Sequence, residues 1–147
     1  MQVNFPNVLD LRLTAGGLGR YHIVIQMRKK QIGEGKNVLA AAFGCHYDIK
    51  HAIVVDEDID IDEPTQIEWA VATRFQAEKD LVVINRGLGS MLDPSTKKRS
   101  LSSKVGYDAT IYVDKPEEFY VSRVPTSKQV LEDKLSVDSQ APFCDYV

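Results

Sequence analysis

The sequence contains little cysteine and no long apolar run, and these absences exclude several classes of protein. Cys45 and Cys144 are the only cysteines among 147 residues, and they lack Cys-x-x-Cys spacing. This argues against a structural zinc site and favours a reduced, cytoplasmic protein. No apolar segment approaches the ~20 residues that a membrane helix needs. The N-terminal stretch lacks a basic segment followed by an apolar one, so we expect no signal peptide.

The excess of acidic over basic residues is also small. A formal net charge of −3 gives no general attraction to nucleic acid or to anionic membranes. Hydrophobic residues make up 44% of the chain and charged residues 27%, which is typical of a globular protein. A chain of this length predicts one domain that is large enough to bury a core.

The segment from Lys50 to Arg74 organises the predicted fold. His51 to Val55 is a short, mainly apolar run, typical of a strand covered on both faces. Pro64 fits the first position of a helix, and apolar residues follow it at helical spacing. Leu81 to Ile84 is a further apolar run. Strand, helix and strand in this order predict a right-handed crossover between parallel strands.

The N-terminal part predicts a β-hairpin followed by a helix. Val8 to Thr14 and Tyr21 to Met27 have strand patterns, and the glycine-rich segment Ala15 to Gly19 would form the turn between them. Val38 to Phe43 predicts a short helix that Gly44 would end. These elements predict an α/β fold: a mixed sheet with an N-terminal β-hairpin and a parallel βαβ crossover, with helices packed on the sheet.

Two glycine-rich segments do not match nucleotide-binding motifs. Gly33 to Lys36 precedes the predicted helix, but Lys30 stands where a P-loop needs its first glycine, and Asn37 stands where it needs Ser or Thr. Gly16 to Gly19 links two predicted strands rather than a strand and a helix, so it is not a dinucleotide-binding fingerprint.

Six acidic residues in eight positions follow the central strand: Asp56, Glu57, Asp58, Asp60, Asp62 and Glu63. Their oxygens suit a magnesium or calcium site, although EF-hand spacing is absent, and no pair stands out as a general acid and base. They also suit capping of the following helix or docking against a basic surface of another protomer. We favour a structural or docking role, because charges about 7 Å apart in water repel by only ~0.6 kcal/mol.

Two loops are candidates for a binding pocket. Cys45 to His51 is rich in polar side chains and fits either a pocket wall or an ordinary surface loop, and its two histidines are a weak metal motif. Asn85 to Asp93 follows the second predicted strand of the crossover, and ligands of open α/β sheets bind beyond the carboxyl ends of strands. Ile111 to Val113 predicts a short strand, and beyond Lys115 the pattern weakens.

A series of short motifs runs along the chain between Val8 and Thr110. They are Val55-Asp56-Glu57-Asp58-Ile59-Asp60, Trp69-Ala70, Ala72-Thr73-Arg74, Asp80, Leu92-Asp93-Pro94, Ser103-Lys104, Gly106 and Asp108-Ala109-Thr110. Their combination resembles the C-terminal domain of the UbiD family, the reversible decarboxylases that use prenylated FMN. The hairpin and the helix that follows it also stand where that family has them.

The resemblance implies non-oxidative removal or addition of CO₂ on aromatic or α,β-unsaturated carboxylic acids. In that family, the catalytic Glu-Arg-Glu set, the metal ligands and most flavin contacts lie in domains that precede this one. The resemblance therefore implies that prenylated FMN and its divalent metal are bound mainly by regions outside this chain, and that the chain alone is inactive. The domain would close against the flavin domain, supply part of the substrate pocket and build the oligomer.

The resemblance also implies two sets of site residues. Residues that line the substrate pocket would be Asp48, Lys50, Arg86, Leu88, Met91 and Leu92. Signature residues with structural roles would be Asp56, Glu57, Asp58, Asp60, Trp69, Arg74, Asp93, Pro94, Lys104 and Asp108. Residues 1–113 would form the domain, and residues 114–147 a tail that docks on a partner or protomer.

Three hypotheses for the function follow. The first is the C-terminal domain or small subunit of a UbiD-like carboxy-lyase, with a catalytic region or subunit and a small carboxylic acid as partners, and no nucleic acid or membrane. The second is a non-catalytic assembly or regulatory subunit of a larger decarboxylase. The third is an independent α/β domain that binds a small ligand, and the extended resemblance argues against it.

Overall fold

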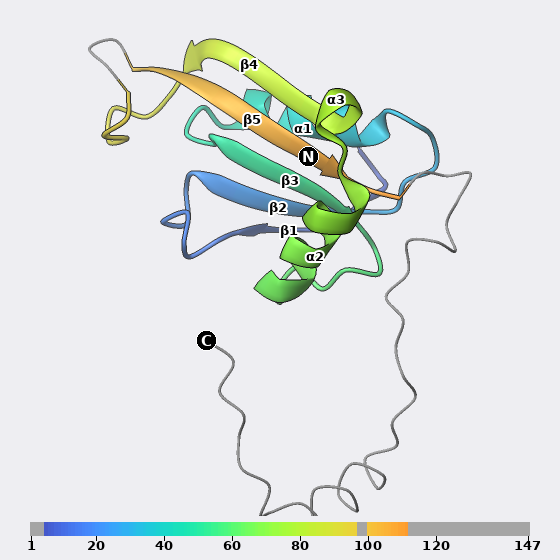
Figure 1. The fold of residues 1–147 in the computed structure, drawn as a ribbon. Helices are drawn as coiled ribbons and strands as arrows, with labels where there is room; N and C mark the ends of the chain where they lie inside the picture. Colours follow the sequence, from blue (N-terminus) through green and yellow to red (C-terminus); the bar gives the residue numbers. More distant parts are fainter. Residues whose placement is uncertain (1–4, 97–99, 112–147) are drawn as a thin grey trace, which may run out of the picture.

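The computed structural model describes residues 5–96 and 100–111, which form a mixed five-stranded sheet with helices on both faces (Figure 1). The strands lie in the order β1-β2-β3-β5-β4. Strands β2, β3 and β5 are parallel, while β1 and β4 run antiparallel at the two edges. In chain order the elements are β1 (Val8–Leu13), β2 (His22–Met27), α1 (Glu34–Cys45), β3 (His51–Asp56), α2 (Pro64–Arg74), α3 (Ala77–Asp80), β4 (Leu81–Leu88) and β5 (Leu101–Ala109).

The predicted hairpin is present as β1 and β2. Its turn is held by the Thr14 side chain, whose Oγ1 accepts a hydrogen bond from the Gly17 amide at 3.1 Å. Leu18 and Gly19 both have left-handed backbone angles, with φ of 57° and 61°. Glycine adopts this conformation at little cost, so Gly19 suits its position, whereas Leu18 adopts it at a cost.

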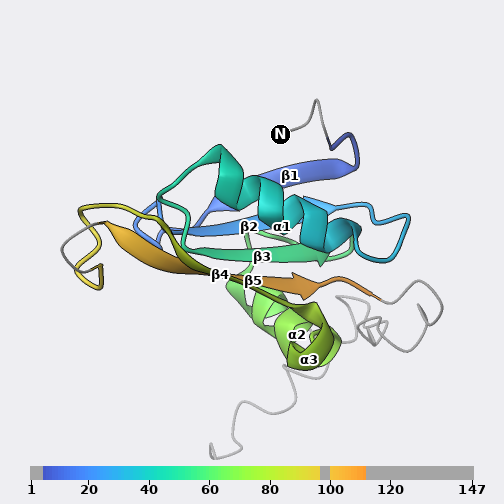
Figure 2. The same ribbon diagram turned by 90° about the horizontal axis from the view of Figure 1, so that it is seen from above.

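Helix α1 covers one face of the sheet and α2 with α3 cover the other (Figure 2). The α1 side holds the larger apolar core, built from alternate residues of β2 and β3 and from the helix. Its buried members include Ile23, Ile25, Met27, Val38, Leu39, Phe43, Ala52 and Val54. Full burial of such a side chain contributes about 1.5–3 kcal/mol, so this layer supplies much of the stability of the fold.

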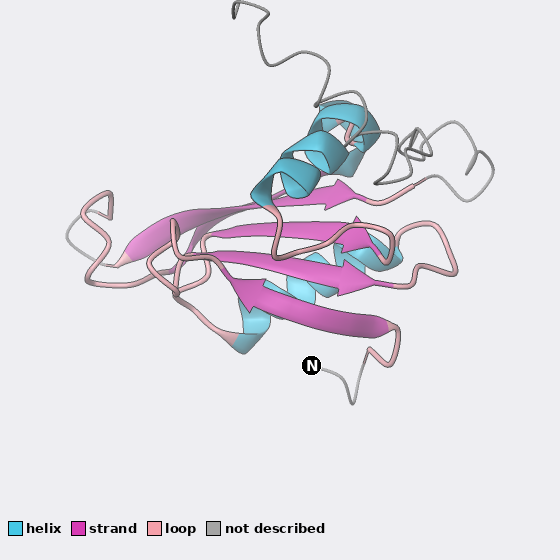
Figure 3. Cartoon of the chain, turned by 90° about the horizontal axis from the view of Figure 1, so that it is seen from below, coloured by secondary structure: helices cyan, strands magenta, loops and turns pink. Residues whose placement is uncertain are grey.

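The α2 side has a second, smaller core that leaves part of the sheet open. Ile67 and Ala70 of α2 pack with Val24, Ile53 and Val55 of the sheet. Helix α2 lies toward β5. It therefore leaves β1 and the amino end of β2 uncovered (Figure 3). Two cavities open on this uncovered part of the face.

Three local predictions need correction. A parallel βαβ crossover exists, but it joins β2, α1 and β3. The run Leu81–Ile84 begins β4, an edge strand antiparallel to β5 and only partly buried, rather than a buried parallel strand. Helix α1 begins at Glu34 and continues through Gly44 to Cys45, so Gly44 does not end it.

The prediction of a short strand at residues 111–113 is also wrong where it can be assessed. The strand ends at Ala109, and Ile111 follows it as a buried loop residue. Residues 112–147, including the predicted tail, lie outside the described residues.

Candidate functional site at the amino end of the parallel strands

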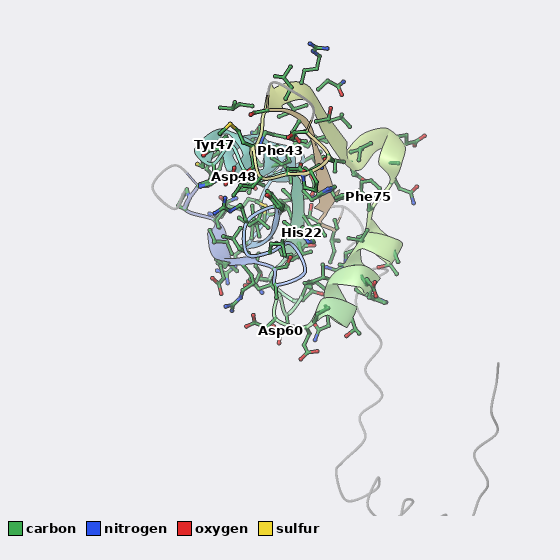
Figure 4. The ribbon with its side chains drawn as sticks, turned by 90° about the vertical axis from the view of Figure 1, so that its left-hand side faces the viewer. His22, Phe43, Tyr47, Asp48, Asp60 and Phe75 are labelled. Carbon is green, nitrogen blue, oxygen red and sulfur yellow. The ribbon has the colours of Figure 1, made fainter. Side chains whose placement is uncertain are left out.

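Three loops meet at the amino end of β2 and β3. They are the hairpin turn, the 46–50 loop that precedes β3, and the 89–96 loop that follows β4. The Lys50 amide donates a hydrogen bond to the Tyr21 carbonyl at 2.9 Å, which joins the first two loops. The Lys50 ammonium contacts Asp93 at 2.9 Å and Ser95 at 2.5 Å, which joins the third. Figure 4 faces this end of the molecule.

This placement corrects the expected location of a binding site. Strand β4 is antiparallel, so the loop after it returns to the amino end of the parallel strands. The acidic turn after β3 lies at the opposite, carboxyl end. The loop after β4 stays a predicted part of a pocket, and it lies at the other end of the sheet from the one that the sequence predicted.

A cavity of about 620 Å³ opens among the three loops, on the uncovered part of the α2 face. Its polar lining includes His22, Lys50, His51 and Asp93, and its apolar lining includes Ile53 and Val71. A second cavity of about 770 Å³ continues from it between the hairpin and α2. Both cavities share His22, Ile53, Val71 and Gly16, so they form one surface depression with a polar end and an apolar end.

Two histidines lie next to each other in the polar end. His22 begins β2 and His51 begins β3, and the two residues are direct partners in the parallel register. Their ring centroids are 6.3 Å apart in an edge-on arrangement. The His22 ring contacts the Thr14 hydroxyl, with 3.1 Å between Nδ1 and Oγ1. Figure 4 shows His22 near the centre of this end.

The surroundings of these histidines favour the uncharged form of both rings by lowering the pKa of each. Burial lowers the pKa of His22 below its ordinary value, and the neighbouring His51 lowers it further. Burial also lowers the pKa of His51, with a further lowering from Lys50 that Asp93 partly opposes. A neutral imidazole has one nitrogen that donates and one that accepts, so each ring can do both.

Of the residues predicted to line the pocket, Lys50 is in the cavity wall. Asp48 is buried, and Oδ2 lies 3.3 Å from the Arg20 guanidinium. Arg86, Leu88, Met91 and Leu92 are exposed on the end of β4 and the loop after it, and Met91 is 85% exposed. Arg86 occupies a bulge in β4 with a left-handed φ of 56°. A pocket role for these residues stays a prediction.

Several signature residues make contacts that hold this end of the fold together. Lys104 is buried and its ammonium donates to the carbonyls of Tyr47 and Ile49 at 2.7 and 2.6 Å. Asp93 accepts from the Ser95 amide as well as from Lys50. Although burial favours a higher value, these bonds hold the pKa of Asp93 below its usual range. Pro94 is exposed in the turn between Asp93 and Ser95.

The acidic turn is held by arginines of the same chain. Arg74 is fully buried and contacts Asp58 at 2.6 Å and Asp56 at 3.3 Å. The Trp69 ring lies against this guanidinium, and the Arg74 Cζ atom is 5.0 Å from the ring centroid. Nearer the surface, Arg28 pairs with Glu57 and Arg12 pairs with Asp62, both at 2.6 Å. These contacts favour the structural interpretation of the turn.

Helix capping by the acidic side chains, one of the structural options, is not present. The residue that precedes α2 is Glu63, and its side chain makes no capping hydrogen bond. Asp60 instead accepts from the Asp62 amide at 2.9 Å within the turn.

Within residues 5–96 and 100–111, no group of three histidine, cysteine or acidic side chains is arranged to hold a metal ion. The same residues include no helix long and apolar enough to cross a membrane.

Asp56 and Asp108 link the carboxyl ends of the strands to neighbouring segments. The Asp56 carboxylate accepts a hydrogen bond from the Ile111 amide at 2.6 Å. Burial raises its pKa to about 6, despite the opposing effects of the Ile111 amide and Arg74. Asp108 accepts from the Thr110 hydroxyl at 2.5 Å and lies directly against Gly35 in the first turn of α1.

His22 was the main residue that sequence reasoning missed. His51 was recognised only as part of a polar loop. The strand period was available as a signal, because it places His22 on the face of β2 opposite to Ile23, Ile25 and Met27. Its significance depends on the register that places it beside His51, and the register is a tertiary property.

Comparisons with known proteins identify the family. Residues 1–109 match the model of the 3-octaprenyl-4-hydroxybenzoate carboxy-lyase C-terminal domain, the UbiD C-terminal domain. The chain is 47% identical over 123 residues to the anhydromevalonate phosphate decarboxylase of Aeropyrum pernix, covering 84% of this chain and 28% of the relative. It is 35% identical over 117 residues to the gallate decarboxylase of Lactiplantibacillus plantarum, covering 71% of this chain and 24% of the relative.

Solved structures give the same result. The UbiD-class enzyme HmfF from Pelotomaculum thermopropionicum, in complex with FMN, matches with a TM-score of 0.82 and 42% identity. The match covers 90% of this chain and 30% of HmfF. The chain thus spans less than a third of the length of these relatives. From the family match and these similarities, the chain belongs to the UbiD family, in which it corresponds to the C-terminal domain.

Proposed function

We propose that this chain is the C-terminal domain, or a separate small subunit, of a UbiD-like carboxy-lyase that acts on an aromatic or α,β-unsaturated carboxylic acid. Its relatives include decarboxylases of anhydromevalonate phosphate and of gallate. HmfF has been solved with FMN and, in an evolved dimeric form, with prenylated FMN. The proposal rests mainly on the match along nearly all the described residues.

The cofactor and its metal are proposed to bind outside this chain. Arg12, Arg28 and Arg74 already engage four carboxylates of the acidic turn. The glycine-rich segment forms a hairpin turn with no helix after it, so it lacks the helix N-terminus that phosphate sites use. The acidic turn and the hairpin turn therefore do not fit a flavin phosphate with its metal, and this chain is assigned no reaction step through that group.

This chain would contribute one wall of the substrate pocket. The depression at the amino end of β2 and β3 is open to the outside, with polar groups at one end and apolar residues at the other. Leu88, Met91 and Leu92 project from the same end and are strongly exposed. Exposed apolar side chains grouped in this way are typical of a surface that packs against another domain. We propose that the flavin-binding region covers this end.

An affinity purification from the native cells tests the proposal. The chain would be retrieved through a tag, and the intact masses and absorbance spectra of all retained polypeptides would be measured. We expect either a second, larger chain that carries flavin, or one longer polypeptide that contains this sequence and carries flavin. Recovery of the chain with no flavin in any retained polypeptide would contradict the proposal.

The exposed tip of Leu88, Met91 and Leu92 also favours a second candidate, a non-catalytic assembly subunit. Met91→Asp and Leu92→Asp in the assembled enzyme separate the two. A pocket role predicts altered substrate preference with the oligomeric state unchanged. An assembly role predicts a changed oligomeric state, measured by light scattering, with unchanged kinetics per catalytic centre.

A further inference from the structure

We propose that His22 and His51 recognise an oxygen substituent of the substrate, remote from the carboxyl group that is removed. The inference rests on the proposed function and names the residues of this domain that determine which acid is accepted. The two imidazoles lie at the polar end of the depression, where they would bind this oxygen. The apolar part of the substrate would lie against Ile53 and Val71, which both cavities share.

The two histidine rings lie close together on the open part of the sheet face. Direct pairing of His22 with His51 in the parallel register places both side chains on the same face of adjacent strands. Helix α2 covers that face farther along the strands and leaves the amino end open. Ring centroids 6.3 Å apart leave both rings within reach of one polar group of a ligand.

The hairpin turn orients the His22 ring. Thr14 Oγ1 accepts a hydrogen bond from the Gly17 amide at 3.1 Å and lies 3.1 Å from His22 Nδ1. A hydroxyl group has one proton to donate and two acceptor lone pairs. We infer that Thr14 donates its proton to Nδ1, which leaves the ring proton on Nε2. Nε2–H is then the donor that His22 presents to a ligand, and Nδ1 is not available.

Gly17 completes this positioning. A Cβ atom at residue 17 would stand 2.5 Å from the His22 Cβ and 2.8 Å from its backbone nitrogen. Any larger residue there would therefore displace His22. The turn thus both fixes the ring through Thr14 and makes room for it through Gly17, so Thr14 and Gly17 are positioning residues.

The charges around the cavity favour recognition by neutral hydrogen bonding. Lys50 is paired with Asp93 at 2.9 Å, and Arg20 is paired with Asp48 at 3.3 Å. Burial lowers the pKa of both histidines and so favours their uncharged form. The ligand group that fits is an oxygen that accepts a hydrogen bond, which a hydroxyl and a phosphate both supply.

The test uses the assembled, cofactor-loaded enzyme with matched pairs of carboxylic acids. One pair differs by a hydroxyl group and the other by a phosphate group, both remote from the carboxyl group. We expect the wild type to have different KM values for the two acids of one of these pairs. For that pair, His22→Ala and His51→Ala should each raise KM for the substituted acid about three- to tenfold, which is the usual effect of losing one neutral hydrogen bond. KM for the unsubstituted acid and kcat for both acids should change little.

His46→Ala is the matched control. His46 lies in the neighbouring loop, is exposed and stacks on Tyr47 outside the two cavities, so its KM values should equal those of the wild type. Thr14→Val should reproduce part of the His22 effect. Circular dichroism and thermal unfolding would establish that every variant folds, and long-range nitrogen–proton NMR of the wild-type chain would read the tautomer of His22.

Three results would overturn the inference. One is an active wild type whose His22 and His51 variants keep wild-type KM values for both members of each pair. Another is a His22 ring protonated at Nδ1 in the NMR spectrum. A wild type that decarboxylates no acid at all would contradict the proposed function, and this inference with it, so the two failures can be told apart.

Discussion

Gly35 shows how a single residue can control the packing of a helix on the sheet. A Cβ atom at this position would collide with the carboxyl group of Asp108, whereas Gly44 in the same helix has open space around it. We therefore expect Gly35→Ala to lower the free energy of unfolding by about 1–3 kcal/mol, the usual cost of overpacking. Gly44→Ala should instead raise it by about 0.5–1 kcal/mol, because alanine favours a helix over glycine. Urea unfolding of both variants measures the difference, and equal effects would contradict the packing argument.

Asp56 should make stability depend on pH. Its pKa of about 6 lies above the ordinary value of 3.8, because burial disfavours the charged form. The folded state therefore binds the proton more tightly than the unfolded state. The contribution of Asp56 to the free energy of unfolding is largest below pH 4 and falls as the pH rises to about 6, by at most about 3 kcal/mol.

Carbon NMR of the Asp56 carboxyl group would follow this titration directly. Asp56→Asn retains an oxygen that can accept the Ile111 amide but cannot titrate. The variant should therefore lose this part of the pH dependence. An Asp56 carboxyl that titrates near pH 4 would contradict the prediction.

At the scale of the elements, the acidic turn and α2 are joined by the guanidinium of Arg74, which is fully buried. Arg74→Met should leave Asp56 and Asp58 without their buried partner and cost about 3–5 kcal/mol. Arg12→Met is the matched control, since Arg12 and Asp62 are 50% and 62% exposed. An exposed pair of this kind contributes less than about 1 kcal/mol. Chemical denaturation of the two variants compares them, and a similar loss in both would show that burial of Arg74 has no special weight.

Elements with a local chemical signal could be predicted from the sequence. Pro64 marked the start of α2, the glycines after Thr14 marked the hairpin turn, and the apolar run of β3 marked a central strand. The interpretation of the acidic turn as structural agrees with its arginine contacts. Arg74 was predicted only as a signature residue with a structural role, and its carboxylate partners Asp56 and Asp58 were not predicted.

Elements whose character depends on distant neighbours were missed. Strand β5 lies between β3 and β4, yet it carries Ser102, Lys104 and Asp108, which are buried polar residues. Lys104 is satisfied by carbonyls more than fifty residues away in sequence, so no local pattern could indicate a buried strand there. The direction of β4 was missed for the same reason, because an apolar run does not specify its partner strand. The His22 and His51 site depends on that same long-range pairing.

For the whole molecule, the match to the C-terminal domain of the family leads to a prediction about activity. We expect the purified chain to have no decarboxylase activity when prenylated FMN is added, because the catalytic Glu-Arg-Glu set of the family would lie in another region. Turnover of a carboxylic acid, measured as released CO₂, would contradict this. The assembled enzyme is the control that establishes that the assay and cofactor are competent.

The acidic turn should also bind no divalent metal tightly, since four of its carboxylates are engaged by arginines. Calorimetric titration of the chain with magnesium and with manganese should give no micromolar site. A micromolar site that disappears in Asp58→Asn would contradict this prediction and reverse the interpretation of the turn.

The two ends of the described chain lie together, away from the histidines. Val8 pairs with Met27 and the Ile111 amide bonds to Asp56, so residues 5 and 111 both lie at the carboxyl end of the parallel strands. At about 3.3 Å per residue, the nine residues of β5 span about 30 Å. Residues 5 and 111 therefore lie about one strand length from the histidine end of the sheet. A rigid rotation of the domain by about 10° about that end would move the histidine end by about 5 Å and would leave the contacts inside the domain unchanged.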